Sequence, residues 1–587
     1  MSSRGIKIQK MLKISTKFLI GVILIVGFFI YINALPNGFV WDDEEQIVNN
    51  TVIQHWSNLP LIFTSSTFYG GGAGLSGGFY RPFVLLSYVL NYHIWGLNPL
   101  GFRFFQLLFH LANLVLIFFI LKKIFSIQRI KYGAEISALT TLLFAVHPAN
   151  VESVAYLGSF GEILYSFFGL LAIWIFLKGV NYENRDIENK SLLLAFVFIF
   201  LGLLSKESAI TIFLILFLYL LIFLRPKLLV YGKYFLGSGI ITGFYIFLRF
   251  FIAKIPTIST HFAPISATSF LERLQTIPYS IFSYFRIIFF PKDLSISQHF
   301  VVFSIYDFRF WGSLIFILII LLLAGFYIWK TKSKLAVFFL LWFFVALFPT
   351  LNILPLDMTV AERWLYFPMI GLLAFISYIL FQLKDGLPQI GQKFLFAFII
   401  LILLLLGART VLRNENWKNG LTLFSHDIQY SKNSFDLENN YGVELFRVSK
   451  FDEAKEHFEK SIELQPKWTY PHNNLGAVLE RSKDLEGALT EYKKATELSD
   501  YYLAYENIGG ILLKMNKYSE AKDFLSQSLL KFPRNANLKW QLALVYLKEN
   551  DIQKATALLL MALQDDSQNQ KVRQLLGAIQ NGIEIKF

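Results

Sequence analysis

Four consecutive carboxylates, those of Asp42, Asp43, Glu44 and Glu45, directly follow the first long apolar run of the chain, residues 18–35. As a helix, that run is long enough to cross a hydrocarbon core of ~30 Å, so the four acids are expected just beyond one membrane face. A partly desolvated carboxylate at such a position can take a proton from a hydroxyl group. Considered alone, the four acids fit more simply a solvated loop that caps the end of a helix.

Further ionisable side chains follow later apolar runs, in the segments FAVHPANVESVAYLGSFGE, LLSKESA and FPTLNILPLDMTVAERWLYFP. Any one of these groups could simply pair with a neighbour or extend its charge to water from the end of a helix. Together, acids, a histidine and cations on one face indicate a polar cavity, in which a cation could neutralise a phosphate. The candidate ligand-binding residues in these segments are His147, Glu152, Lys206, Glu207, Glu362, Arg363 and Tyr366.

The elements that must position these residues are membrane helices. The 587-residue chain is 55% hydrophobic with a mean hydropathy of +0.50, which excludes a single soluble domain and indicates a multi-pass membrane protein. Its formal net charge is +13, but Lys and Arg cluster in short segments between apolar runs, as in cytoplasmic loops near anionic lipid, so nucleic acid is not the expected partner. The chain contains no cysteine, which excludes disulfides and thiolate metal sites.

The positions of basic residues predict the topology. Arg4, Lys7, Lys10, Lys13 and Lys17 precede the first run, so the N-terminus is expected in the cytoplasm and the four acids outside it. We expect the first run to be a retained anchor, and not a removed signal peptide, because it is too long and lacks a clear cleavage site. We expect about eleven spans, at 18–35, 101–121, 133–147, 156–177, 191–205, 209–224, 234–252, 311–329, 335–350, 365–382 and 394–411.

One apolar segment, 269–291, is ambiguous because it contains charged side chains and Pro278. If it crossed the membrane, the basic cluster at 330–334 would fall outside, so we expect 269–291 to lie in or re-enter the outer interface. With eleven crossings, the C-terminal part of the chain then emerges on the same side as Asp42.

That C-terminal part is polar and repetitive. Ala454, Ala488, Ala521 and Ala555 recur at spacings of 34, 33 and 34 residues, and a glycine stands twelve residues before each of the first three. The period and the small residues predict tetratricopeptide repeats, in which paired helices approach closely. Four repeats and a capping helix near 570–580 would form a short solenoid whose concave face binds extended peptides or protein surfaces. The expected fold class is therefore all-α.

A family resemblance rests on the order of the motifs FVWDDEEQIVNN, YRPFVLLSYVLNYHIWGLNPLGFRFFQLLFHLANLVLIF, FAVHPANVESVAYL, LLSKESA and AERWLYFP, followed by the repeats. In this order the chain resembles the transmembrane and tetratricopeptide-repeat-containing O-mannosyltransferases and their bacterial relatives, of the GT-C glycosyltransferase superfamily. The resemblance covers nearly the whole chain. It implies an inverting transfer of a sugar from a polyprenyl-phosphate carrier to a protein Ser or Thr hydroxyl, with mannose as the sugar of the eukaryotic members.

The resemblance also implies roles for individual residues. The paired acids of the family fall on Asp42 and Asp43, so we expect Asp42 to be the general base and Asp43 to orient the acceptor or hold a cation. Lys206 and Arg363 are the candidates for the donor phosphate. His147, Glu152, Glu207, Glu362 and Tyr366 complete the expected donor site. Where relatives often carry an arginine after YLGS, this chain has Phe160, so that contact is in doubt here.

These expectations define three regions: a GT-C-like membrane domain at 1–412, with a first outer loop at 36–100, a linker at 413–433 and the repeats at 434–587. The repeats would lie outside the cytoplasm and bind the acceptor polypeptide. The high Lys, Ile, Asn and Phe content points to an AT-rich, bacterial genome and hence to a bacterial inner or plasma membrane. No cofactor is required by the sequence, although four adjacent acids could hold a divalent cation.

Two other functions fit the same residues. A GT-C enzyme could act on a lipid or an envelope glycan in place of a protein. Alternatively, a non-catalytic membrane scaffold could use its repeats to assemble envelope proteins, in which case the acids at 42–45 would have no chemical role.

Overall fold

The computed structural model describes residues 15–72, 78–255, 262–566, 568–581 and 583. The chain forms two compact units, Met1–Ser431 and Lys432–Phe587, which we call the membrane unit and the repeat unit. Most of the basic N-terminal residues of the topology prediction, Arg4 to Lys13, lie outside the described residues. The fold is all-α: within the described ranges the strands β1 (Val180–Asn181) and β2 (Asp186–Ile187) form a single short hairpin, with Val180 opposite Ile187.

The membrane unit contains the expected apolar helices. Among the described residues, eight helices are long and apolar enough to cross a membrane: Thr16–Ala34, Pro99–Ile127, Leu157–Gly179, Glu207–Leu224, Leu228–Ile252, Phe308–Thr331, Pro368–Asp385 and Gln389–Asn416. Three shorter apolar helices are Gly133–Ala145, Asn189–Leu203 and Lys334–Thr350. Together these helices occupy the eleven positions at which the sequence predicts spans.

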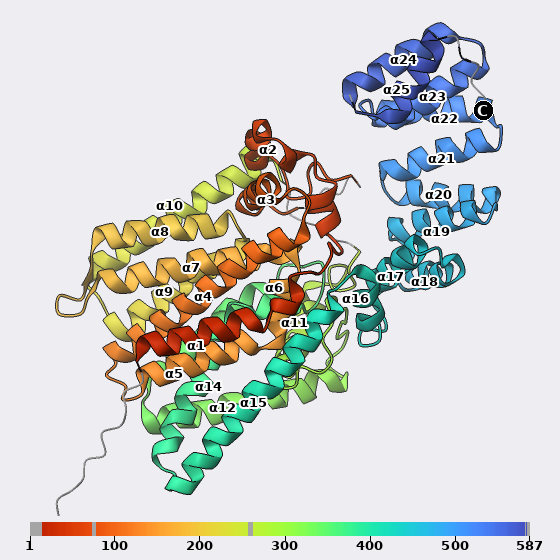
Figure 1. Ribbon diagram of the computed structural model, residues 1–587. Helices are drawn as coiled ribbons and strands as arrows, with labels where there is room; N and C mark the ends of the chain where they lie inside the picture. The colour runs from red at the N-terminus through yellow and green to blue at the C-terminus, as the bar shows by residue number, and fades with distance from the viewer. Residues whose placement is uncertain (1–14, 73–77, 256–261, 567, 582, 584–587) are drawn as a thin grey trace, which may run out of the picture. The chain divides into compact units, whose positions relative to one another are not determined.

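Small residues allow the membrane helices to pack closely, as is common in such bundles. The helices α1 (Thr16–Phe29), α4 (Pro99–Ile127), α5 (Gly133–Val146), α7 (Phe160–Gly179) and α8 (Asn189–Leu203) run side by side (Figure 1). A Cβ atom on Gly27 would lie 2.5 Å from the side chain of Leu114, and one on Gly169 would lie 2.2 Å from that of Ile212. These glycines therefore set the distance between neighbouring helices.

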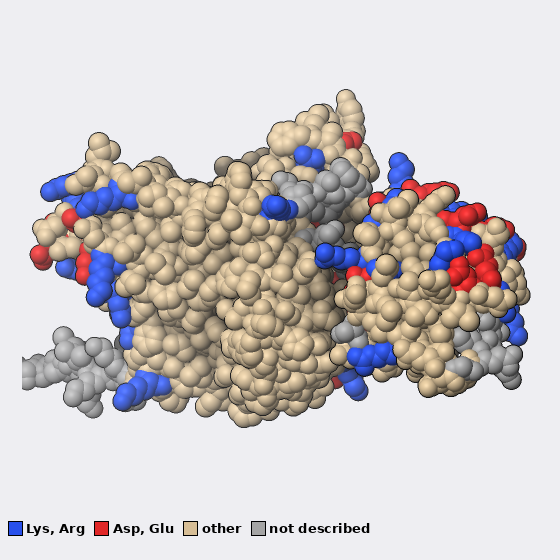
Figure 2. All heavy atoms as spheres, turned by 90° about the horizontal axis from the view of Figure 1, so that it is seen from above, with Lys and Arg blue, Asp and Glu red and all other residues tan. Residues whose placement is uncertain are grey.

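The connections of the membrane unit differ in charge at its two ends. The connections from α4 to α5, from α7 to α8 and from α9 (Ile210–Tyr219) to α10 (Leu228–Phe247) lie at the same end, opposite the loop that follows α1 (Figure 1). Figure 2 shows basic side chains, with some acidic ones among them, gathered at that end, beside a broad surface free of charged residues on the face in view. This is the pattern of a bundle whose basic loops share one membrane face. The assignment of that face to the cytoplasm stays a prediction.

The ambiguous segment forms α11 (Phe270–Phe289), which is not among the eight candidate spans. The hydroxyl of Ser269 accepts a hydrogen bond from the backbone N–H of Glu272, while the Glu272 carboxylate accepts one from the N–H of Ser269, which closes a capping box. A helix that begins with a hydrophilic cap and carries charges on one side is typical of an interfacial position. Its placement in the outer interface stays a prediction.

The repeat unit consists of helix pairs and a final helix. Its helices are α17 (Phe435–Arg447), α18 (Phe451–Leu464), α19 (Thr469–Arg481), α20 (Leu485–Leu498), α21 (Tyr502–Lys514), α22 (Tyr518–Lys531), α23 (Ala536–Lys548), α24 (Ile552–Asp565) and α25 (Gln570–Gln580). The four recurring alanines are fully buried. A Cβ atom on Gly442 would lie 2.7 Å from the ring of Phe458, and one on Gly476 would lie 2.6 Å from that of Tyr492. These two glycines thus make room for the aromatic ring of the paired helix.

Candidate active site

The acidic loop is held in place by Asp43. Its Oδ2 accepts a hydrogen bond from the backbone N–H of Val40 at 3.1 Å, and its Oδ1 accepts one from that of Gly158 at 2.8 Å. Burial raises the pKa of Asp43 to about 7, while the charge of Arg103 and the two N–H groups offset part of that increase. Asp43 has no exposed surface, so in this conformation it fixes the loop and does not face a ligand.

Arg103 of α4 also binds this loop. Its guanidinium donates hydrogen bonds to three backbone carbonyls, those of Asn37 at 2.6 Å, Gly38 at 2.5 Å and Ala155 at 3.0 Å. It also lies 3.9 Å from the carboxylate of Asp43, and only 1% of its surface is exposed. A buried arginine with this many partners ties the acidic loop to the membrane helices.

Of the two acids predicted to be catalytic, Asp42 is the one that stays accessible. It is only half-buried, and its Oδ2 accepts a hydrogen bond from the hydroxyl of Tyr156 at 3.0 Å. The ring of Tyr156 is stacked between Trp41 and Trp417, at centroid distances of 5.2 and 5.3 Å. Trp41 has a φ of 56°, an uncommon conformation for a non-glycine residue that turns the chain just before Asp42. Burial raises the pKa of Asp42 to about 6, against the lowering effects of Tyr156 and Arg363.

Arg363 lies close to this acid and is itself anchored by Glu152. The fully buried Glu152 carboxylate accepts hydrogen bonds from the guanidinium of Arg363 and, at 2.7 Å, from its backbone N–H. The guanidinium carbon lies 5.8 Å from the ring centroid of Trp41, and its charge lowers the pKa of Asp42. The side chain of Arg363 keeps 13% of its surface exposed, so this cation is both fixed and partly open to a ligand.

Lys206 is fixed in a similar way. Its ammonium group forms a buried ion pair with Glu162 near the start of α7. Burial lowers the pKa of Lys206, and the positive charges of Arg81 and Arg363 act in the same direction, while Glu162 raises it. These mutual effects indicate that Lys206, Arg81 and Arg363 share one electrostatic environment.

Two further arginines, Arg81 and Arg249, enclose Glu207. Arg81 Nη2 lies 3.4 Å from one oxygen of Glu207, and Arg249 Nη1 lies 3.2 Å from the other. The side chain of Arg81 also lies next to Gly161, where an added Cβ atom would be 3.8 Å from its Cδ. Arg81 directly precedes α3 (Pro82–Trp95), so the start of that helix positions its side chain. With two arginines against one carboxylate, this cluster carries excess positive charge.

His147 has no described contact with the residues around Asp42. Its Nδ1 accepts a hydrogen bond from the backbone N–H of Ala149 at 3.2 Å, so its Nε2 carries the proton and donates to the carbonyl of Ile288 at 2.9 Å. Because the backbone occupies both ring nitrogens, the geometry favours a local structural role.

Tyr366 and Glu362 belong to two other buried networks. The hydroxyl of Tyr366 lies 2.8 Å from Nδ1 of His110, inside the helix bundle. Glu362 lies 3.7 Å from Arg413, whose guanidinium makes shorter bonds, of 2.5 and 3.0 Å, with Asp427. Burial raises the pKa of Glu362, and the charge of Arg413 opposes this effect.

A metal site is not evident in the described ranges: no group of three or more His, Cys, Asp or Glu side chains is placed there to hold a metal ion. Of the four consecutive acids, Asp42 faces Tyr156, Asp43 faces the backbone and Arg103, and Glu45 accepts a hydrogen bond from Asn49 at 3.1 Å. The carboxylates of these three acids thus have different partners.

The structure adds residues that the sequence prediction did not include, namely Arg81, Arg103, Arg249 and Tyr156. Arg103 and Arg249 stand as single cations in long apolar runs, a signal that by itself marks a buried or functional position. Arg81 precedes a proline in a segment without any other charge. Nothing in the local sequence around Tyr156 indicates that its hydroxyl binds Asp42.

The apolar helices and the helical repeats together define a multi-pass α-helical membrane protein with a C-terminal tetratricopeptide array. Family models described as tetratricopeptide repeat match residues 439–467 and 512–579, which agrees with the predicted period.

Sequence relatives extend this likeness to the membrane unit. The chain is 24% identical over 612 residues to the human protein O-mannosyl-transferase TMTC3, an alignment that covers 90% of this chain and 66% of that protein. It is 26% identical over 501 residues to human TMTC1, covering 76% and 55%, and 30% identical over 209 residues to human TMTC4, covering 33% and 28%. These relatives confirm the resemblance to the O-mannosyltransferases with tetratricopeptide repeats. The chain spans about two thirds of the length of TMTC3.

Proposed function

We propose that this protein is an integral-membrane glycosyltransferase that transfers a sugar from a polyprenyl-phosphate carrier to Ser and Thr hydroxyls of extracytoplasmic proteins. The observation that carries the proposal is the half-buried carboxylate of Asp42, held beside an anchored cation, Arg363. Similarity to proteins named as protein O-mannosyl-transferases supports this reaction class and suggests mannose as the sugar.

In the proposed reaction Asp42 is the general base. The acceptor hydroxyl oxygen forms a bond to the anomeric carbon, its proton passes to Asp42, and the bond between the anomeric carbon and the phosphate oxygen breaks. The electron pair of that bond stays on the departing polyprenyl phosphate. A pKa of about 6 leaves Asp42 mainly ionised at neutral pH and more basic than an ordinary aspartate, as this step requires. We assign Asp43 and Arg103 a positioning role, because they fix the loop that carries Asp42.

The departing phosphate develops negative charge that fixed cations can stabilise. Lys206, Arg363, Arg81 and Arg249 are the candidates, and each is held by a carboxylate: Glu162, Glu152 or Glu207. Such an ion pair holds the cation in position before the ligand binds, so the cation needs little rearrangement on binding. Arg81 and Arg249 share one carboxylate, so we expect this pair to carry the charge that a phosphate would neutralise.

The membrane unit would lie in a bacterial plasma membrane. The repeat unit would bind the acceptor polypeptide on the extracytoplasmic side. Tetratricopeptide arrays commonly bind extended peptides. A C-terminal tag that reacts with a membrane-impermeant reagent in intact cells would agree with this topology. Labelling only after the membrane is broken would place the repeats in the cytoplasm, and the proposed acceptor could then not reach them.

The test is transfer of labelled mannose from polyprenyl-phosphate-mannose to a Ser/Thr-containing polypeptide by the purified, detergent-solubilised protein. Asp42→Asn should reduce the rate at least about a hundredfold, since a general base contributes typically 10²- to 10⁴-fold. Glu183→Gln, in the exposed connection between α7 and α8, is the matched control and should leave the rate unchanged. Transfer by Asp42→Asn at the wild-type rate would overturn the proposal.

The same assay separates the two other functions. Label found on lipid or envelope glycan, and not on polypeptide, would keep the base assignment but change the acceptor class. The absence of transfer to any acceptor, together with a cellular defect that requires residues 434–587 and not Asp42, would favour the scaffold.

A further inference from the structure

The last helix of the membrane unit, α15 (Gln389–Asn416), ends against the acidic loop. The side-chain amide of Asn37 donates a hydrogen bond to the backbone carbonyl of Asn414 at 3.0 Å. The backbone N–H of Gly38 donates one to the carbonyl of Lys418, also at 3.0 Å. The residues just before the paired acids are therefore bound both by α4 and by the end of α15.

Trp417, the residue that follows α15, extends this contact toward the candidate base. Its ring has no exposed surface and stacks on the ring of Tyr156, with a centroid distance of 5.3 Å and an angle of 23° between the planes. Trp41 also stacks on Tyr156, at 5.2 Å and 20°. We call these three side chains the ring stack. It begins at a fully buried residue and ends at the residue directly before Asp42.

The middle ring of the stack carries the hydroxyl that contacts the carboxylate. Tyr156 donates a hydrogen bond to Oδ2 of Asp42 at 3.0 Å. Tyr156 directly follows α6 (Val151–Ala155) and has an extended backbone, with a φ of −90° and a ψ of 118°. Its side chain can adopt other rotamers about χ1. The two tryptophan rings therefore restrict where its hydroxyl points.

The buried end of the ring stack is held by charged groups. Arg413, about one helical turn before Trp417, forms hydrogen bonds with Asp427 at 2.5 and 3.0 Å, and neither charged side chain has any exposed surface. Asp427 is the last residue of α16 (Gly420–Asp427), and its Oδ2 also accepts a hydrogen bond from the backbone N–H of Ile296 at 2.8 Å. Breaking such a pair leaves a buried charge without its partner, so Trp417 is carried by a firmly held part of the fold.

The same charged groups also approach the cation of the proposed site. Arg413 lies 3.7 Å from Glu362, the residue directly before Arg363. The guanidinium carbon of Arg363 lies 5.8 Å from the ring centroid of Trp41. The end of α15 thus contacts, directly or through one neighbour, both the loop of Asp42 and the turn of Arg363.

We infer that Trp417 is a positioning residue for the proposed transfer, which holds Tyr156 and Trp41 so that the carboxylate of Asp42 faces the acceptor hydroxyl. Trp417 acts through the other two rings of the stack. A displacement of about 1 Å can slow a reaction about a hundredfold. Residues 413–433, expected to be only a linker, would then belong to the catalytic unit. The inference rests on the proposed function for its effect on transfer, whereas the position of residue 42 can be measured without it.

The first test measures transfer by the full-length, detergent-solubilised protein. Trp417→Leu removes the ring and should lower kcat about ten- to a hundredfold, while the KM for the sugar donor changes less than about threefold. Trp417→Phe keeps a smaller ring and should lower kcat only about two- to fivefold. Trp342→Leu removes an equally buried indole from α13 (Lys334–Leu347), and this matched control should keep the wild-type kcat.

The pH–rate profile separates positioning from a general loss of stability. Without the stack, Tyr156 no longer holds its hydrogen bond to Asp42, which stabilises the ionised carboxylate, so the acidic limb should move to higher pH. The other charged groups that act on Asp42 include Asp43, Arg363, Asp357 and Glu45. The substitution removes none of these groups. In Trp342→Leu the limb should stay in place.

The second test does not depend on transfer. The chain contains no cysteine, so Asp42→Cys places a single thiol at the half-buried position of the candidate base. When Trp417→Leu is added, a maleimide should alkylate this thiol at least about threefold faster, because a loop that is held less firmly opens more often. When Trp342→Leu is added to Asp42→Cys, the alkylation rate should not change.

The inference is overturned if Trp417→Leu keeps the wild-type kcat and acidic limb, or if Trp342→Leu lowers kcat as much. It is also overturned if Trp417→Leu leaves the alkylation rate at position 42 unchanged. Should Trp417→Leu fail to fold, Trp417→Phe supplies the same comparisons in the same directions. If the wild type transfers no sugar, the proposed reaction is wrong, and the alkylation rates alone decide whether Trp417 positions the loop.

Discussion

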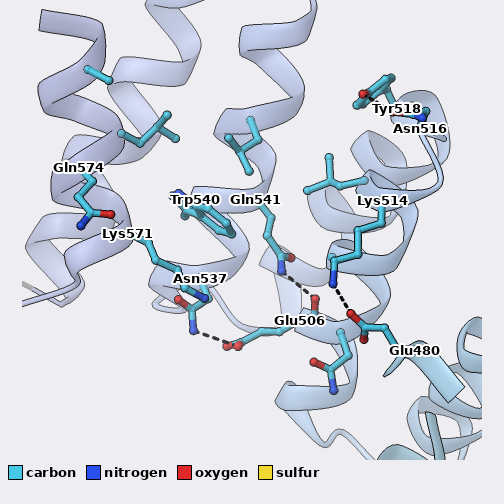
Figure 3. A pocket seen from close by; sticks show the side chains of 16 residues that line it. Glu480, Glu506, Lys514, Asn516, Tyr518, Asn537, Trp540, Gln541, Lys571 and Gln574 are labelled. Atoms are coloured by element: carbon cyan, nitrogen blue, oxygen red, sulfur yellow. Dashed lines mark hydrogen bonds and ion pairs between the residues drawn. The ribbon is translucent and has the colours of Figure 1, made fainter. Parts of the chain in front are cut away.

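The two polar regions of this molecule are built in opposite ways. Around the acidic loop of the membrane unit, several charged groups are buried in ion pairs, as Asp43 is with Arg103. The repeat unit has a groove of about 930 Å³, in which neutral amides such as that of Gln541 lie near the partly exposed ion pair of Lys514 and Glu480 (Figure 3). The first arrangement fixes a few atoms in one geometry, whereas the second leaves its ion pair in contact with water.

The difference has an energetic consequence. Removing one member of a buried pair leaves an uncompensated charge, whereas removing one member of an exposed pair changes stability little. Single substitutions should therefore have large effects in the acidic loop and small effects in the groove. The predictions below test this contrast.

The largest effect is expected for Arg103→Met. The substitution removes three hydrogen bonds to backbone carbonyls and leaves Asp43 buried without its cation, which should cost about 3–5 kcal/mol of stability. Thermal unfolding in detergent measures this loss. Arg286→Met, which removes an exposed partner of Asp293 in the same unit, is the control and should unfold near the wild-type temperature. Equal effects of the two substitutions would contradict the contrast.

A smaller effect is expected for a packing change in the repeat unit, Gly476→Ala. The added methyl group would lie 2.6 Å from the ring of Tyr492, so the helix pair must shift, at a cost of about 1–3 kcal/mol. In α25 no atom of another helix or side chain in the described part of the chain lies within 4 Å of the position that a Cβ atom on Gly577 would take. Gly577→Ala should therefore stabilise its helix by about 0.5–1 kcal/mol. Chemical unfolding of the full chain, followed by tyrosine and tryptophan fluorescence, compares the two variants.

The architecture of both units could be predicted from the sequence because each depends on a local property. Crossing a membrane requires a long apolar run, and stacking repeats requires a regular period, so the eleven apolar helices and the repeats occur where they were expected. The side-chain partners within the site depend on which helix ends meet in space. No spacing in the sequence indicates that Glu152 anchors Arg363, or that Glu162 anchors Lys206.

The prediction for His147 illustrates the limit. A histidine at the end of an apolar run is a reasonable ligand, and only the structure reveals that Ala149 and Ile288 occupy its two nitrogens. Arg103 illustrates the opposite case, since a lone cation in an apolar run could have been recognised as important. Its function as a clamp still depends on carbonyls from two distant segments.

An intermediate effect is expected at the cluster around Glu207. Replacing both Arg81 and Arg249 by glutamine removes two positive charges that could bind the donor phosphate. This change should raise the apparent KM for the sugar donor about tenfold, or about 1.4 kcal/mol, with a smaller change in the maximal rate. Each single variant should have a lesser effect, because the other arginine remains. Arg185→Gln, in the exposed connection between α7 and α8, is the control. If the double variant has the same KM for the donor as the wild type, Arg81 and Arg249 do not bind the donor phosphate.

The smallest effect is expected for Tyr156→Phe, and it tests the base directly. The pKa of Asp42 is raised to about 6 by burial, so the ionised base is lost as the pH falls through 6, and transfer should decline about tenfold per pH unit below that value. The hydroxyl of Tyr156 stabilises the ionised form through its hydrogen bond to Asp42, and its removal should raise that pKa. The acidic limb of the pH–rate profile should therefore move to higher pH.

The same variant separates Asp42 from its neighbour. The carboxylate of Asp43 accepts hydrogen bonds from Val40 and Gly158 and faces Arg103, so loss of the Tyr156 hydroxyl should change the pKa of Asp43 less than that of Asp42. A phenylalanine ring preserves the stacking against Trp41 and Trp417, and Tyr231→Phe on α10 serves as the control. If the acidic limb of the pH–rate profile does not move, Asp43 or another group accepts the proton, because only Asp42 loses a hydrogen bond in this variant. A displaced limb with an unchanged rate at high pH would identify Asp42 as the base.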